Sequence, residues 1–123
     1  MLKIETEHTD DGFTICRPIG ELDAFTVSQF RQALAELASQ PRLVIDMSAV
    51  PFVDSAGLGA LIGGIRRARE LGGDVVVVVN RPGLVRTLKT TGFDRIVAMT
   101  ETLDAAKEAF EKPAEDGGTP PEA

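Results

Sequence analysis

Hydrophobic and polar positions alternate in two short runs at the start of the chain. Leu2 and Ile4 mark the first run, and Phe13 and Ile15 mark the second. A two-residue repeat is typical of a β-strand that buries one face. The Asp11-Gly12 dipeptide between the runs is a common hairpin turn. The pattern therefore predicts an antiparallel pair of strands.

Later apolar residues recur every three or four positions, which is the spacing of a helix that buries one face. The four stripes are Val27, Phe30, Leu34 and Leu37; Leu58, Leu61, Ile62, Ile65 and Ala68; Leu84, Val85 and Leu88; and Leu103, Ala106 and Phe110. The sequence therefore predicts four amphipathic helices.

Capping and helix-breaking residues indicate where these helices begin and end. Thr26 followed by Gln29 fits a capping box, and Pro41 follows a helix that we expect from about Val27 to about Ser39. The second helix is expected to have Ser55 as its N-cap and to end at Gly72-Gly73. The third helix is expected to begin with Pro82 and to end at Gly92. Thr100 or Thr102 is expected to cap the last helix.

Three further apolar runs alternate with the helices and predict strands. They are RLVIDM (42–47), DVVVVVN (74–80) and RIVAM (95–99). The middle run is apolar on both faces, which is typical of a buried parallel strand. The order β-β-α-β-α-β-α-β-α predicts an α/β fold, a single domain with a mixed, mostly parallel sheet covered by about four helices. Loops at the carboxyl ends of such strands tend to carry function.

The composition changes after Lys112. Residues 113–123, PAEDGGTPPEA, have no periodicity, are rich in Pro and Gly, and carry acidic residues without a basic one. Such a segment buries too little apolar surface to fold. We therefore expect a folded domain over residues 1–112 and a disordered acidic tail over residues 113–123.

Charge and cysteine content exclude several classes of protein. The chain of 123 residues has a formal net charge of −6, which disfavours a nucleic-acid-binding protein because phosphate neutralisation needs a basic surface. The single cysteine, Cys16, forms no intrachain disulfide and is expected in the core. The polar N-terminus is not a signal peptide, and the aliphatic run Val75–Val79 is too short to span a bilayer. We therefore expect a cytoplasmic protein without a membrane partner.

The turn VDSAGLG (53–59) is the strongest candidate site because it joins a predicted strand to a helix. We expect Ser55 to be the N-cap, with its hydroxyl accepting a hydrogen bond from the N–H of Gly57 or Leu58. Gly57 and Gly59 leave the first helical turn without side-chain cover, so that another molecule could approach it closely. The alternative is a cap with no further role and glycines that serve only packing.

Enzymatic interpretations of this region lack the necessary groups. Val53 stands where a G-x-S-x-G nucleophile elbow needs glycine, and the only histidine, His8, lies near the predicted hairpin. The glycines match neither a dinucleotide-binding motif nor a P-loop. Asp46 could be the phospho-acceptor of a receiver-like domain, but it fits better as a carboxylate at the end of a strand that accepts hydrogen bonds from loop N–H groups. The sequence has no Cys/His cluster, so we predict no enzyme, metal site or cofactor.

Modification of Ser55 is the remaining interpretation. A phosphate adds about −1.5 to −2 charges, and a helix N-terminus tolerates negative charge. Asp54 next to it, and Asp23 if the two loops converge, would make the local charge denser. A docked partner would have to desolvate this charge. Phosphorylation would therefore switch binding without a large conformational change.

Several segments resemble the STAS-domain anti-sigma-factor antagonists (anti-anti-sigma factors) of bacteria. They are GELDAFT (20–26), LVIDMSAVPFVDSAGLGALI (43–62), GGDVVVVVNRPGLVRTLKTTGFDRIV (72–97) and TLDAAKEAF (102–110), and the likeness covers about Leu2 to Phe110. The resemblance implies a protein that binds an anti-sigma factor with serine kinase activity and thereby frees a sigma factor. It also implies that this kinase phosphorylates Ser55 and releases the antagonist, and that a serine phosphatase resets it. ATP and metal ions belong to those partners.

The resemblance also indicates which residues contact the partner. They are Asp23, Asp54, Ser55, Ala56, Gly57, Leu58 and Gly59. Many family members carry a second hydroxyl residue after the acceptor, whereas this chain has Ala56, which leaves Ser55 as the sole acceptor of the motif. The implied role is transcription regulation by partner switching in a stress response. The alternative is a small-ligand or nucleotide-binding STAS module of a transporter or sensor complex.

Arg66, Arg67 and Arg69 lie on the outward side of the second predicted helix. Basic residues near a helix C-terminus interact favourably with the helix dipole, so we interpret them as a solvated helix end. As a rim of partner contacts they would lie about 16–21 Å along the helix from Ser55.

Overall fold

The computed structural model describes residues 2–111, which form a five-stranded sheet and four α-helices. In chain order the elements are β1 (Lys3–His8), β2 (Thr14–Ile19), α1 (Val27–Glu36), β3 (Arg42–Asp46), α2 (Ser55–Glu70), β4 (Asp74–Val78), α3 (Pro82–Thr90), the 3₁₀ turn η1 (Phe93–Arg95), β5 (Ala98–Thr100) and α4 (Leu103–Glu111). The strands lie in the order β1-β2-β3-β4-β5, with β1 antiparallel to β2 and the other pairs parallel. This arrangement confirms the predicted α/β class and mixed sheet.

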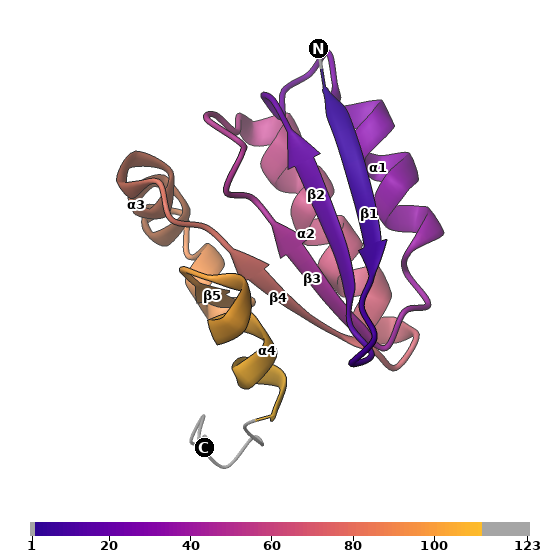
Figure 1. The fold of residues 1–123 in the computed structure, drawn as a ribbon. Helices are drawn as coiled ribbons and strands as arrows, with labels where there is room; N and C mark the ends of the chain where they lie inside the picture. The colour runs from indigo at the N-terminus through magenta and orange to yellow at the C-terminus, as the bar shows by residue number, and fades with distance from the viewer. Residues whose placement is uncertain (1, 112–123) are drawn as a thin grey trace.

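Helices cover both faces of the sheet (Figure 1). The apolar stripes of α1, α2 and α3 belong to the larger core cluster, which also takes Leu43 and Ile45 of β3. α4 lies on the opposite face and covers a smaller cluster that includes Val44 of the same strand. Successive residues of β3 therefore point into different buried clusters, which explains why this central strand is continuously apolar.

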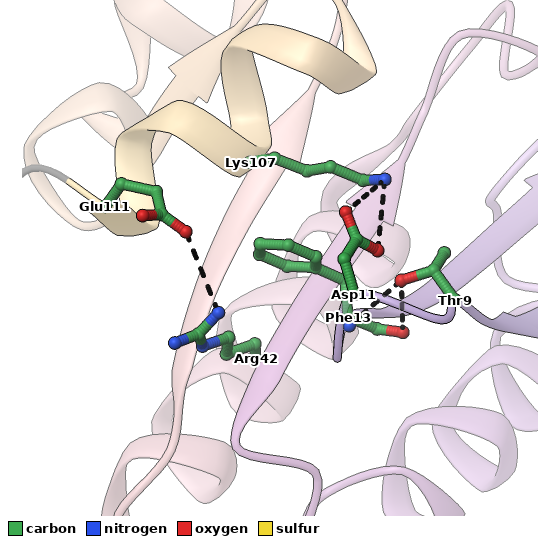
Figure 2. A network of polar contacts seen from close by, with 6 residues as sticks. All are labelled: Thr9, Asp11, Phe13, Arg42, Lys107 and Glu111. Carbon is green, nitrogen blue, oxygen red and sulfur yellow. Dashed lines mark hydrogen bonds and ion pairs between the residues drawn. The ribbon is translucent and has the colours of Figure 1, made fainter.

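Polar contacts join α4 to the β1–β2 hairpin and to the start of β3 (Figure 2). Lys107 Nζ donates to the Asp11 carboxylate at 3.1 Å, and Arg42 lies 3.9 Å from Glu111. The two cations also approach the ring of Phe13, at 5.3 Å for Arg42 and 5.4 Å for Lys107. These contacts surround the smaller apolar cluster at the end of the sheet remote from the VDSAGLG turn.

The start of α1 differs from the predicted capping box. Thr26 occupies the N-cap position but makes no side-chain hydrogen bond into the helix. Its hydroxyl donates to the carbonyl of Glu21 at 2.8 Å and accepts from the N–H of Asp23 at 3.0 Å. Gln29 donates to the carbonyl of Leu2 at 3.1 Å. The capping-box prediction is wrong because both side chains form hydrogen bonds with residues that precede the helix instead of capping its first turn.

Two boundaries also differ from the sequence-based expectation. α1 ends at Glu36 instead of near Ser39, because the chain leaves the helix while Leu37 and Ala38 remain buried in the core. The last strand spans Ala98–Thr100 instead of 95–99, because η1 occupies Phe93–Arg95 and the buried ring of Phe93 anchors it.

Four other predicted helix ends agree with the structure, those at Pro82, Thr102, Gly72 and Gly92. Pro82 is the first residue of α3, and Thr102 caps α4 by accepting from the N–H of Ala105 at 3.0 Å. Gly72 and Gly92 follow α2 and α3 with φ angles of 91° and 83°, a left-handed conformation that glycine adopts readily. These stop signals were therefore correctly read from the sequence.

The predicted tail, residues 113–123, lies outside the described residues. Within residues 2–111, no helix has the length and apolarity needed to cross a membrane. The same residues contain no group of His, Cys, Asp and Glu side chains that is suited to hold a metal ion.

Candidate functional site

Two loops lie side by side at the carboxyl ends of β2 and β3. Leu22 of the first loop forms an isolated parallel bridge with Val53 of the second. The N–H of Leu22 donates to the carbonyl of Phe52 at 3.0 Å, and the N–H of Asp54 donates to the carbonyl of Leu22 at 3.1 Å. The structure therefore brings the segments around Asp23 and Ser55 together.

The N-cap of α2 is Asp54 and not Ser55, which corrects the sequence-based prediction. One carboxylate oxygen of Asp54 accepts from the N–H of Gly57 at 2.9 Å, and the other accepts from the N–H of Ala24 at 3.2 Å. A carboxylate has two oxygens, so one side chain caps the helix and also ties it to the neighbouring loop. A serine hydroxyl offers a single oxygen for these two tasks.

Ser55 is consequently free of a capping role. It is the first residue of α2 and is exposed, and its hydroxyl makes no hydrogen bond to any of residues 2–111. The hydroxyl therefore lies at the positive end of the helix dipole, and its modification would break no hydrogen bond among residues 2–111.

Asp23 shapes the neighbouring loop in a similar way. Its Oδ1 accepts from the N–H groups of Phe25 at 2.9 Å and Thr26 at 3.1 Å, and its carbonyl accepts from the N–H of Val27 at 2.9 Å. Asp23 therefore organises the turn that precedes α1, and its carbonyl satisfies the first N–H of the helix, that of Val27. Asp23 and Asp54 therefore hold the two loops through hydrogen bonds and add negative charge to them.

The glycines of α2 serve different purposes, and this modifies the expectation of an uncovered first turn. Gly57 is buried, and a Cβ there would collide with the backbone carbonyl of Leu22. Gly64 packs against the side chain of Leu34 in the same manner. Of the four glycines in α2, only Gly59 and Gly63 face open space. Packing therefore explains Gly57, whereas Gly59 keeps the helix surface low beside the exposed serine.

The acidic side chains of this region lack ion-pair partners. Within residues 2–111, neither Glu21, Asp23 nor Asp54 lies in a salt bridge. Two of the three arginines of α2 form ion pairs near its other end, where Arg67 lies 3.7 Å from Glu70 and Arg69 lies 3.8 Å from Asp74. These contacts agree with a solvated helix end and do not involve the acidic side chains of the two loops.

The other titratable candidates lie elsewhere and have structural roles. His8 ends β1 and contacts the hydroxyl of Thr14 at 3.1 Å, at the end of the sheet where β2 begins. Ser55 lies at the other end of the sheet, beyond the carboxyl end of β3, so His8 cannot act as a base for it. Cys16 is buried in the core as expected, and burial raises the pKa of its thiol to about 11.

Asp46 behaves as a strand-end carboxylate. It accepts from the N–H of Ser48 at 3.0 Å and from Nε of Arg17 at 3.0 Å. Burial raises the pKa of this carboxyl, but the hydrogen bonds from Ser48 and Arg17 outweigh it, so the pKa lies below its usual value. Sequence reasoning anticipated the loop N–H bond and missed Arg17, which reaches Asp46 across adjacent parallel strands.

Phe25 was also missed by the sequence reasoning. It lies in the loop between Asp23 and Thr26 and is 96% exposed. The available signal was its position outside the apolar stripe that begins at Val27. An aromatic residue that joins no buried stripe is a candidate for contact with another molecule.

These features define the class of protein. An exposed serine, whose hydroxyl forms no hydrogen bond among residues 2–111, begins α2 directly after Asp54, and the loop of Asp23 lies beside it. The STAS domain family model matches residues 3–106. The chain belongs to the STAS domain family.

Relatives with known names agree with this assignment. The chain is 31% identical over 99 residues to an anti-sigma F factor antagonist of Paenibacillus polymyxa, covering 78% of this chain and 84% of that protein. It is 28% identical over 98 residues to an anti-sigma-B factor antagonist of Listeria monocytogenes, covering 78% and 86%. Among solved structures, an anti-sigma factor antagonist from Mycobacterium paratuberculosis matches with a TM-score of 0.81 and 32% identity over 91% of this chain and 96% of that one. The class these relatives define is one of regulatory binding proteins, not of enzymes.

Proposed function

We propose that this protein is an anti-sigma-factor antagonist that phosphorylation of Ser55 switches off. Unphosphorylated, it binds an anti-sigma factor with serine kinase activity through the two loops and the first turn of α2, and a sigma factor is released. The kinase then phosphorylates Ser55 and the complex dissociates. A serine phosphatase restores the binding form in the cytoplasm.

The free hydroxyl of Ser55 is the observation that carries this proposal. Asp54 satisfies the N–H of Gly57, so adding a phosphate to Ser55 removes no hydrogen bond from the fold. The helix dipole stabilises negative charge at this end of α2. The phosphorylated protein is therefore expected to remain folded, and the change in binding arises at its surface.

Electrostatics explains why the phosphate would release the partner. It adds about −1.5 to −2 charges to a region where Asp23 and Asp54 have no ion-pair partner among residues 2–111. A bound partner would have to strip water from this dense charge, and juxtaposed like charges at an interface cost several kcal/mol. A site that binds with a neutral hydroxyl therefore rejects the phosphorylated form.

Mass spectrometry after incubation with ATP and a panel of purified bacterial anti-sigma factors with serine kinase activity tests the proposal. One member should modify the wild type at Ser55 and leave Ser55→Ala unmodified. Ser39→Ala is the matched control, because Ser39 is exposed and lies beyond the end of α1, away from the loops. It should be phosphorylated like the wild type. Modification only at another serine, or of none, would contradict the proposal.

A further inference from the structure

Phe25 exposes an aromatic ring that the fold does not use. Its exposed fraction is 96%, whereas Phe13, Phe30 and Phe93 are buried and Phe52 is 49% exposed. Burial of a phenylalanine side chain is strongly favourable in water. A nearly fully exposed ring therefore keeps this gain available for a complex.

The backbone that presents Phe25 is held in place from three sides. Asp23 Oδ1 accepts from the N–H of Phe25 at 2.9 Å, and Asp54 Oδ2 accepts from the N–H of Ala24 at 3.2 Å. The hydroxyl of Thr26 donates to the carbonyl of Glu21 at 2.8 Å. Because its backbone is held in this way, the loop loses little conformational freedom on binding, and pre-organisation of this kind increases affinity.

The surroundings of Phe25 indicate the chemistry of its partner. Phe25 lines a hollow of about 590 Å³ together with Glu21 and Asp23, and no arginine or lysine among residues 2–111 lines it. Neither carboxylate forms an ion pair within residues 2–111. An apolar projection beside uncompensated negative charge is complementary to an apolar pocket bordered by cations. This acidic setting opposes an anionic lipid surface or a nucleic acid as the occupant.

We propose that Phe25 is the apolar anchor of the partner-binding surface, and that it enters a pocket bordered by arginine or lysine on the anti-sigma factor. This inference rests on the proposed function and adds a contact to it. The loop of Phe25 is tied directly to the N-cap of α2 through Ala24 and Asp54, so one partner can cover the ring and Ser55 together. Aromatic side chains at the centre of an interface often carry most of its binding energy.

Binding and phosphorylation measurements with one kinase test the anchor. The probe is the member of the anti-sigma-factor panel that phosphorylates wild-type Ser55, titrated by calorimetry. Phe25→Ala should weaken binding by about 30-fold, the loss typical of an interface hot spot, and should raise the KM for phosphorylation while leaving kcat unchanged. Leu71→Ala is the matched control because Leu71 is apolar, 52% exposed and follows the far end of α2. It should bind like the wild type.

A second variant tests the charged border. Glu21→Gln should slow association and weaken its dependence on salt, because a rim charge acts mainly on the rate of encounter. Equal affinities of Phe25→Ala, Leu71→Ala and the wild type for a kinase that modifies Ser55 would overturn the anchor and leave the proposed function intact. Wild-type protein that no panel member binds or phosphorylates would overturn both. A thermal melt should show Phe25→Ala folded, because an exposed ring contributes little to the core.

Discussion

Replacement of Gly57 by alanine should destabilise the domain by separating the two loops of the site. The added Cβ would collide with the carbonyl oxygen of Leu22 and would lie 2.9 Å from the carbonyl carbon and the Cβ of the same residue. Two of these atoms are backbone, and Leu22 is fixed by its bridge to Val53. The collision is therefore relieved only when α2 and the loop after β2 move apart.

The magnitude follows from two opposing effects. Overpacking of a tightly filled site costs about 1–3 kcal/mol, and a rigid backbone neighbour favours the upper part of that range. Alanine in place of glycine returns at most about 1 kcal/mol of helix propensity. The free energy of unfolding should therefore fall by about 2 kcal/mol. Gly59→Ala should instead raise it by about 0.5–1 kcal/mol, because a Cβ at Gly59 meets nothing within 4 Å.

Urea denaturation of the two variants measures this difference directly. The midpoints should be separated by about 1–3 M, given the urea dependence usual for small domains, with Gly59→Ala above the wild type and Gly57→Ala below it. If Gly57→Ala is as stable as Gly59→Ala, α2 does not press against Leu22 and the packing argument fails.

Three further predictions concern the cap, the buried carboxylate and the thiol. Asp54→Ala should lower the free energy of unfolding by about 0.5–2 kcal/mol in urea denaturation, whereas Ser55→Ala should change it by less than about 0.5 kcal/mol; the reverse order would restore Ser55 as the cap. The pKa of Asp46 is lowered in the folded state, so its stabilisation is present above the usual value of 3.8 and is lost as pH falls through the folded-state pKa. The stability gap between the wild type and Asp46→Asn should therefore narrow below about pH 4, and a constant gap would contradict this. Cys16, with its thiol pKa raised to about 11, should resist iodoacetamide at neutral pH until the protein is unfolded in urea, and rapid labelling of the native protein would refute its burial.

Patterns that depend on local chemistry were readable from the sequence. The apolar stripes, Pro82 at the start of α3 and Gly72 and Gly92 after their helices all act through neighbouring residues. Repeats of this kind determine which face of an element is buried, so they predicted the sheet and its covering helices. The bounds of the last strand were harder to predict, because the buried ring of Phe93 fixes a 3₁₀ turn through contacts that are distant in sequence.

The sequence indicated which two loops to examine, and the structure places them side by side, but the hydrogen bonds within them were not predictable from the sequence. Ser55 and Asp54 both suit an N-cap, and the choice depends on the N–H of Ala24, which lies 30 positions away and bonds to Asp54. The role of Gly57 depends likewise on the carbonyl of Leu22 from another loop. Phe25 was overlooked because a sequence pattern reports which residues are buried together and says little about one exposed ring.

The affinity of one anti-sigma factor for the two forms of this protein tests the central claim most directly. Calorimetry would compare unphosphorylated protein with protein that carries phosphate on Ser55, using the panel kinase that modifies this residue. The switch predicts that binding weakens by at least about 100-fold, because charge repulsion at an interface costs several kcal/mol, while circular dichroism shows both forms folded. Affinities that agree within about twofold would contradict it.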